Sequence, residues 1–190
     1  YYYPLSQGAV CDFFETVCRG AGDFPIIGYH VPFFTTGIEI PTFEKLLEIP
    51  NFVGMKDSSA HMKRIAHLCQ IAAEKRPDFA LFTGTDDCLF SALCAGCFGS
   101  MTALAATMPR QIRGIYDAFD AKDMDKAMQI NQSILPIIRQ ADSLTFPIGY
   151  KLLAKLGHKS TRLRPTLPPL PGGRISGMPG TWLAVIRQEE

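Results

Sequence analysis

Residues 52–59 read Phe-Val-Gly-Met-Lys-Asp-Ser-Ser, a short apolar run that ends in a lysine and a polar turn. An apolar run of this length, bounded by turn residues, predicts a fully buried strand rather than a helix. The serine pair offers an N-cap for a helix whose apolar residues recur at helical spacing from Met62 to Ala73. This stretch therefore predicts a strand that is followed directly by a helix.

The same unit recurs on both sides of this stretch. Short apolar runs predict three further strands at 24–29, 79–83 and 97–101. Apolar residues at helical spacing predict helices at 6–19, 42–48, 86–95, 109–119, 124–139 and 147–156. Four buried strands that alternate with helices indicate parallel strands joined by right-handed crossovers, so the expected fold class is α/β.

The composition is that of a globular protein with a small-molecule partner. Of the 190 residues 47% are hydrophobic and the formal net charge is +1, which excludes a disordered or coiled-coil chain. The sequence has no basic cluster, so neither nucleic acid nor a membrane surface is expected as a partner. No apolar run approaches the ~20 residues that cross a bilayer, and the first residues lack the pattern of a signal peptide.

The six cysteines are expected to be reduced core residues of a cytoplasmic protein. Most of them occupy apolar positions in predicted helices or strands, and a chain of this size does not need disulfides for stability. Cys94 and Cys97 form a Cys-x-x-Cys pair, but the pair lacks a second set of ligands and falls within an apolar passage. We therefore expect no metal site.

Lys56 is the leading candidate for chemistry. Lysine is rarely buried, yet this one ends an apolar strand, and βα folds build their sites at the carboxyl ends of strands. A desolvated amine at such a point is nucleophilic and suits Schiff-base formation with a ketone. The alternative is a lysine that reaches solvent and pairs with Asp57, and position alone does not separate the two interpretations.

Tyr29 ends the preceding predicted strand in the same way. A phenol beside an imine is suited to move a proton to and from the substrate. Taken alone, a tyrosine at a strand end is more often an amphipathic core residue whose hydroxyl is hydrogen-bonded. The pairing with Lys56 favours the proton-transfer role.

Polar residues also follow the next two predicted strands. Gly84-Thr85-Asp86-Asp87 opens a helix, and Gly99-Ser100 stands at the end of the following strand. Backbone amides and carboxylates at such points suit an anionic or polyhydroxylated ligand. Asp86 fits a plain helix N-cap equally well.

Five motifs resemble, in order and spacing, those of the N-acetylneuraminate lyase and dihydrodipicolinate synthase superfamily. They are Gly28-Tyr29-His30-Val31-Pro32, residues 51–59, residues 82–87, residues 96–100 and Arg164-Pro165. The resemblance implies a TIM (β/α)8 barrel that binds pyruvate or another 2-oxo acid. It implies that Lys56, on the sixth strand, forms a covalent Schiff base without a cofactor, and that Tyr29, on the fifth, relays protons. It also suggests a homo-oligomer, most often a tetramer.

Within that superfamily, the residues after Tyr29 point to a lyase. Synthases carry an arginine there for the carboxylate of their aldehyde substrate, whereas this chain has Phe33-Phe34-Thr35-Thr36. The resemblance therefore implies an N-acetylneuraminate lyase or a related 2-oxo-3-deoxy sugar acid aldolase. In that comparison the substrate-binding residues are Thr35, Gly84, Asp86, Asp87 and Ser100. The alternatives are 4-hydroxy-tetrahydrodipicolinate synthase, 4-hydroxy-2-oxoglutarate aldolase and a catalytically silent relative.

The resemblance covers only part of such an enzyme. The family's Gly-Thr-Thr-Gly-Glu type of loop, which holds the carboxylate of the 2-oxo acid, does not occur in the sequence. By the order of the motifs, residues 1–165 are expected to form strands five to eight of the barrel and its C-terminal helices, with the N-terminal half absent. Proline and glycine crowd residues 166–190, which predicts an irregular tail. We expect the chain alone to form no stable, active monomer, because its sheet would have open edges and an open face.

Overall fold

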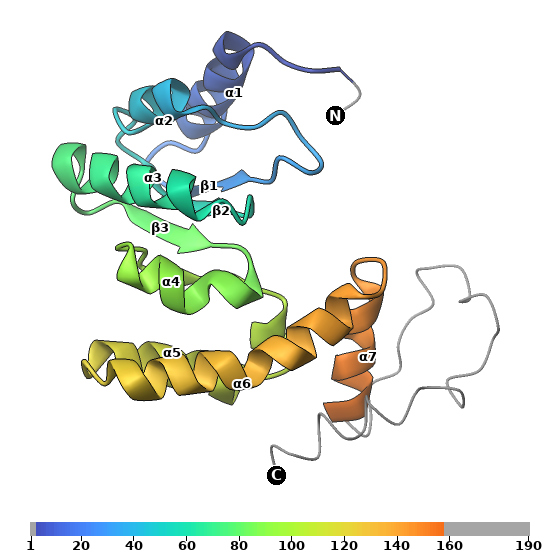
Figure 1. The fold of residues 1–190 in the computed structure, drawn as a ribbon. Helices are drawn as coiled ribbons and strands as arrows, with labels where there is room; N and C mark the ends of the chain where they lie inside the picture. Colours follow the sequence, from blue (N-terminus) through green and yellow to red (C-terminus); the bar gives the residue numbers. More distant parts are fainter. Residues whose placement is uncertain (1–2, 158–190) are drawn as a thin grey trace.

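The computed structural model describes residues 3–157, which form a four-stranded parallel sheet with helices between the strands (Figure 1). The strands are β1 (Ile26–His30), β2 (Phe52–Asp57), β3 (Ala80–Thr83) and β4 (Gly99–Ser100). They lie side by side in sequence order, and each pair of neighbours is parallel. The predicted α/β class and its four strands are confirmed. The predicted tail at 166–190 and the Arg164-Pro165 motif lie outside the described residues.

The helices fall where helical spacing of apolar residues predicts them, with two local differences. The serine pair does not cap the helix that begins at Met62, because His61 stands at its N-cap position and accepts from the backbone N–H of Arg64. The predicted helix at 86–95 begins as a 3-10 turn, and Thr85 rather than Asp86 stands at its N-cap position. The α-helices are α1 (Gln7–Gly20), α2 (Ile40–Leu46), α3 (Met62–Lys75), α4 (Leu89–Cys94), α5 (Pro109–Asp120), α6 (Met124–Asp142) and α7 (Ile148–Gly157), and the 3-10 turns are η1 (Asp86–Cys88) and η2 (Leu104–Ala106).

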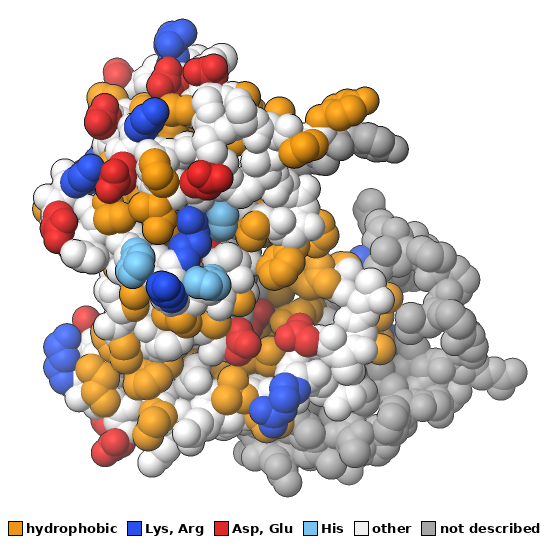
Figure 2. Space-filling view, turned by 45° about the horizontal axis from the view of Figure 1, so that its top comes forward, with side chains coloured by type: hydrophobic (Ala, Val, Ile, Leu, Met, Phe, Trp, Pro, Cys, Tyr) orange, Lys and Arg blue, Asp and Glu red, His pale blue; other side chains and the backbone are white. Residues whose placement is uncertain are grey.

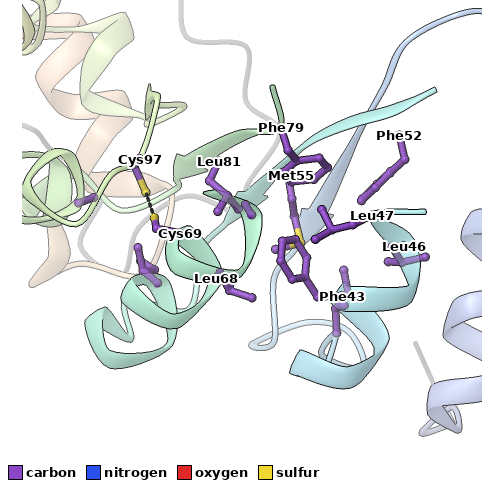
Figure 3. Packing of buried hydrophobic residues seen from close by; sticks show 14 of the residues in the cluster. Phe43, Leu46, Leu47, Phe52, Met55, Leu68, Cys69, Phe79, Leu81 and Cys97 are labelled. Atoms are coloured by element: carbon purple, nitrogen blue, oxygen red, sulfur yellow. Dashed lines mark hydrogen bonds between the residues drawn. The ribbon is translucent and has the colours of Figure 1, made fainter. Parts of the chain in front are cut away.

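One face of the sheet packs against α1, α2 and α3. Phe43 and Leu46 of α2 and Phe52 and Met55 of β2 are fully buried in this core (Figure 3). The Phe52 ring lies edge-on to the Phe14 ring of α1, with 5.4 Å between the two ring centroids. Burial of each such side chain contributes about 1.5–3 kcal/mol to stability. The apolar runs that predict strands therefore supply the core on this face.

The opposite face of the sheet carries Tyr29 and Lys56, and the described residues leave it uncovered. Ile27 is 45% exposed and Tyr29 is 50% exposed. Phe82, which pairs in register with Lys56, is half-buried. Parallel strands with apolar residues on both sides are normally covered on both faces. Within residues 3–157 the sheet thus presents an apolar face that surrounds the two leading candidate residues.

A second apolar cluster joins the C-terminal helices. The helices α5 and α6 lie side by side at the end of the molecule away from α1 (Figure 1). They bury Ile112, Ile115, Ile134 and Ile137 against each other, and Leu153 of α7 joins the same cluster. Two buried leucines of α4 also belong to it. The helices that follow β4 are therefore anchored to the sheet through α4.

Arg76 holds the amino-terminal end of the sheet together. It follows α3, and its guanidinium donates hydrogen bonds to the backbone carbonyls of Leu47, Ile49, Pro50 and Phe52 at 2.6–3.1 Å. These carbonyls belong to the segment that joins α2 to β2 and to the first residue of β2. Because a guanidinium offers five N–H donors in a fixed plane, one side chain satisfies four acceptors.

The distribution of charged side chains on the surface agrees with the near-neutral composition. At the top of Figure 2, acidic and basic side chains are interspersed over α1 and α2.

All six cysteines are free thiols, and Cys69 and Cys97 lie with their sulfur atoms 3.7 Å apart (Figure 3). Cys94, expected in an apolar passage, is exposed. No helix in residues 3–157 is long and apolar enough to span a membrane, and that part of the chain holds no group of three potential metal ligands.

Candidate active site

The pairing of β1 with β2 brings Tyr29 and Lys56 together. The two residues are directly opposite in the parallel register, so their side chains leave the sheet on the same face. The Lys56 ammonium lies over the Tyr29 ring, 4.2 Å from its centroid. Asp57 leaves on the other face and binds Arg64. The structure therefore does not form the Lys56–Asp57 pair that was the alternative interpretation of this lysine.

Ser58 is a third member of this cluster, and its role was not predicted. Its hydroxyl donates to the Tyr29 hydroxyl at 3.5 Å. Burial alone would raise the pKa of Tyr29, but hydrogen bonds from Ser58 and Lys56 and the positive charge of Lys56 bring that pKa below its ordinary value. A tyrosine with a lowered pKa gives up its proton more readily, which suits it to proton transfer near neutral pH. The strand alternation was a usable signal, since residues 56 and 58 share one side of an extended chain.

Gly84, the residue directly after β3, leaves room for the side chains of this cluster because it has no side chain of its own. A Cβ atom on Gly84 would overlap the Ser58 hydroxyl and would lie 2.8 Å from Lys56 Cε. Its backbone N–H donates to the carbonyl of Asp57 at 2.7 Å, which brings the two strand ends together. Gly84 therefore lies against the lysine and the serine, and any larger residue would displace them.

Asp86 is placed differently from the other predicted residues. Its side chain is buried, and Oδ1 accepts a hydrogen bond from the backbone N–H of Leu104 at 2.7 Å. Burial raises the pKa of Asp86, although the hydrogen bond from Leu104 and the nearby hydroxyl groups of Thr102 and Tyr150 partly oppose the shift. The carboxylate thus joins η1 to η2, while its neighbour Asp87 is exposed.

The remaining predicted residues follow the ends of β1 and β4. Thr35 lies in the loop after β1, and its hydroxyl donates to the carbonyl of Val31 at 3.2 Å. That loop also holds Phe33 and Phe34, which are 71% and 68% exposed. Ser100 ends β4 and lines a groove of about 360 Å³ together with residues of β3 and α5.

These contacts divide the predicted residues into two groups. Tyr29, Lys56 and Gly84 form one contact cluster with Ser58. The other group lies at the same carboxyl end of the sheet but outside this cluster: Thr35, Asp86, Asp87 and Ser100. The cluster alone holds an amine, a phenol and a hydroxyl in contact, which is the set that imine chemistry needs.

Comparison with known proteins places this arrangement in a family. Residues 1–171 match the model of the Dihydrodipicolinate synthetase family. The chain belongs to this family, whose members are lyases and aldolases. Family members bind pyruvate, form a covalent Schiff base on a lysine without an external cofactor, and function as oligomers. The superfamily resemblance read from the five motifs is confirmed.

The relatives carry more than one activity in their names. An uncharacterised DapA-like lyase of Thermofilum pendens is 34% identical over 160 residues, which are 82% of this chain and 52% of that protein. A 4-hydroxy-tetrahydrodipicolinate synthase of Kosmotoga olearia is 30% identical over 167 residues, 86% of this chain and 56% of that protein. The solved 2-keto 3-deoxygluconate aldolase of Picrophilus torridus has a TM-score of 0.74 and 25% identity, and the match covers 83% of this chain and 56% of that one. The chain spans about half the length of the curated relatives it matches.

Proposed function

We propose that the chain forms part of a class I aldolase or lyase in which Lys56 makes a Schiff base with pyruvate or another 2-oxo acid. The observation that carries this proposal is the contact of the Lys56 amine with the Tyr29 phenol on the uncovered face of the sheet. Family membership supports it, since lysine Schiff bases are the chemistry of this family.

Tyr29 would be the group that moves protons during this chemistry. The amine attacks the keto carbon, and water leaves from the resulting carbinolamine after its hydroxyl is protonated. The iminium then takes up the electron pair released when the bond to the aldehyde carbon breaks. Hydrogen bonds and the Lys56 charge lower the pKa of Tyr29, which suits it to donate a proton and recover it within one turnover.

For the second substrate we propose a 2-oxo-3-deoxy sugar acid, as in N-acetylneuraminate lyase, with Thr35, Gly84, Asp86, Asp87 and Ser100 around its polyol chain. The segment 31–37 supports this choice because it has no arginine to hold a second carboxylate. The 2-keto 3-deoxygluconate aldolase relative also supports it. The Kosmotoga olearia relative supports 4-hydroxy-tetrahydrodipicolinate synthase at least as well. 4-Hydroxy-2-oxoglutarate aldolase is a further alternative, and a silent family member is the outcome if no imine forms.

We also propose a position for the chain within a complete barrel. The strands β1 to β4 would be strands five to eight, residues 1–165 would form the C-terminal part of the domain, and the uncovered face would line the barrel interior. The supporting observation is that apolar side chains are exposed on that face and not only on the helix-covered one. A cytoplasmic homotetramer is the assembly we expect for the complete protein.

Borohydride trapping tests the proposed imine. In the complete protein, which includes the missing half of the barrel, incubation with pyruvate and sodium borohydride should add one reduced pyruvate to Lys56, read by intact mass and peptide mapping. Lys56→Ala should abolish the adduct, and Lys63→Ala, at an exposed position of α3, should not. An adduct on Lys45, Lys63 or Lys151 in place of Lys56 would show that the site is wrong.

Product assays separate the candidate substrates. Pyruvate release from N-acetylneuraminate or 2-keto-3-deoxygluconate by the complete protein is the expected result for a sugar acid lyase. Condensation of pyruvate with aspartate semialdehyde should be negligible, because a substrate carboxylate beside Phe33 and Phe34 would be desolvated without a cationic partner. Robust condensation would make the synthase the leading function.

A further inference from the structure

Three polar side chains, two of them buried, lie directly behind Tyr29 and Lys56. His30 and Asp57 are the next residues in β1 and β2, and they are paired in the same register. Because successive side chains of a strand alternate between faces, they lie on the helix-covered face of the sheet. His30 is 5% exposed and Asp57 is 1% exposed. The third member, Arg64, reaches them from α3.

The Asp57 carboxylate is the centre of this cluster. Its Oδ2 accepts from Arg64 Nε at 2.8 Å and lies 3.8 Å from His30 Nε2. Its Oδ1 accepts from the backbone N–H of Ser59 at 2.8 Å. Arg64 Nη2 is buried without a hydrogen-bond partner in the described residues, so this carboxylate is what holds the guanidinium. A carboxylate this buried depends on its partners, and removal of any of them leaves an uncompensated group.

His30 links the cluster to the loop after β1. Its Nδ1 accepts a hydrogen bond from the backbone N–H of Ile38 at 3.0 Å. The ring is therefore neutral with its proton on Nε2, which faces Asp57. Burial lowers the pKa of His30 although Asp57 opposes the shift, and Arg64 lowers it further. Asp57 and Arg64 are the charged groups that face the ring, and protonation of Nδ1 would break its bond to Ile38.

Backbone hydrogen bonds tie the cluster to the candidate site. The N–H of Ser58 donates to the carbonyl of His30 at 2.9 Å, and the N–H of Gly84 donates to the carbonyl of Asp57 at 2.7 Å. Three strand ends are thus joined at the level of Lys56. A shift of Asp57 would move Lys56 and Ser58, which flank it in the chain, while a shift of His30 would move Tyr29.

We propose that the His30–Asp57–Arg64 cluster positions the Lys56 amine against the Tyr29 and Ser58 hydroxyls. None of the three faces the open side of the sheet, so they are positioning residues and not catalytic ones. The proposal rests on the proposed role of Lys56 in imine formation. It adds that this geometry is set from the helix-covered face.

The test compares Asp57→Asn with Asp117→Asn in the complete protein. Asp117 is a matched control, because its carboxylate also accepts from an arginine Nε, that of Arg113 at 2.7 Å, but on the exposed surface of α5. For each folded variant, the rate of borohydride-trapped pyruvate on Lys56 is measured together with the thermal midpoint. Asp57→Asn should lower the rate at least about tenfold, and Asp117→Asn should leave it within about twofold. A trapping rate per folded molecule equal to that of Asp117→Asn would overturn the proposal.

His30→Asn supplies a second variant, which decides the matter if Asp57→Asn does not fold. Its amide oxygen can accept from Ile38 in place of Nδ1, but it does not titrate. As the pH is lowered, the trapping rate of the wild type should fall more steeply than that of His30→Asn, because only the wild type has a side chain at position 30 that takes up a proton. Identical pH profiles would contradict a positioning role for His30, whereas a purely structural role would change only the thermal midpoint.

A readout without pyruvate separates this inference from the proposed function. Acetic anhydride modifies Lys56 at a rate that depends on the surroundings of its amine, and peptide mapping reports that rate. If wild-type Lys56 traps no pyruvate, the proposed function fails. A modification rate changed in Asp57→Asn but not in Asp117→Asn would still support positioning by the cluster, and equal rates would overturn it.

Discussion

Gly84 is the residue on which the space around Lys56 depends. Gly84→Ala would force a methyl group against Ser58 and Lys56, so we expect pyruvate trapping on Lys56 to fall at least about tenfold. Gly20→Ala is the matched control, because no atom lies within 4 Å of the Cβ position at Gly20. Both variants are compared by trapping rate and by urea denaturation. Normal trapping in Gly84→Ala would mean that Lys56 does not need this space.

Asp86 gives a prediction about pH. Its pKa is raised in the folded protein, so the folded state binds more protons than the unfolded state above the ordinary value, and stability falls as pH rises through that window. Asp86→Asn keeps an acceptor for Leu104 and removes the buried charge. We expect its unfolding free energy to vary less with pH, and to match or exceed that of the wild type at pH 7. The measurement is urea denaturation from pH 4 to pH 8.

Asp87→Asn provides the control for that prediction. Asp87 is the exposed neighbour of Asp86, so its replacement should change the unfolding free energy by less than about 0.5 kcal/mol at any pH. A marked loss of stability in Asp86→Asn at neutral pH would show instead that hydrogen bonds to the charged carboxylate outweigh its desolvation.

Sequence reasoning found the strand-end residues and missed those that depend on long-range packing. Tyr29 and Lys56 could be predicted because an apolar run that ends in a polar residue marks a strand end. The position of Ser58 on the same side of the chain as Lys56 could have been predicted from strand alternation, but the serine was considered only as a helix N-cap. The partner of Asp86 could not be predicted, because Leu104 is 18 residues away and reaches it through the fold.

The contact between α3 and the segment before β4 predicts a specific disulfide. Cys69 and Cys97 are both buried, with their sulfur atoms 3.7 Å apart, and contact with Cys97 lowers the pKa of Cys69. Hydrogen peroxide should convert the two thiols into one disulfide with release of two water molecules. Peptide mapping should then show Cys69 linked to Cys97.

Two variants check that assignment. Cys69→Ser should abolish the disulfide, whereas Cys18→Ser, at a buried cysteine of α1, should not. The exposed Cys94 is the competitor, since it stands three positions before Cys97. A Cys94–Cys97 disulfide as the main product would show that exposure governs the reaction more than the distance in the folded state.

Element boundaries show what periodicity could and could not predict. The order and type of the elements were correct because apolar runs and helical spacing record burial, and burial is what packs each element. The strand predicted at 97–101 is shorter in the structure, where β4 comprises Gly99 and Ser100 and pairs with β3 alone among the described residues. A local sequence pattern does not show whether a strand lies at the edge of its sheet, where it pairs with one neighbour only.

The open face of the sheet governs the behaviour of the whole molecule. We expect the 190-residue chain to associate with increasing concentration, because uncovered apolar surface and free strand edges favour contact between copies. Ile27→Lys should weaken this association, since Ile27 is 45% exposed on that face. Val17→Lys, at a 38% exposed position of α1, should not. Sedimentation velocity measures both, and a monodisperse wild-type monomer at all concentrations would contradict the prediction.

The carbonyls held by Arg76 lie at the end of the sheet opposite Lys56, which has a consequence for engineering. The contacts that secure β2 at its start share no residue with segment 31–37, where Phe33, Phe34 and Thr35 stand. In βα folds, loops at the carboxyl end vary with chemistry while the other end maintains stability. A combinatorial library confined to 31–37 should therefore explore new specificities with little loss of folded protein, and Arg76 should be kept constant in every member.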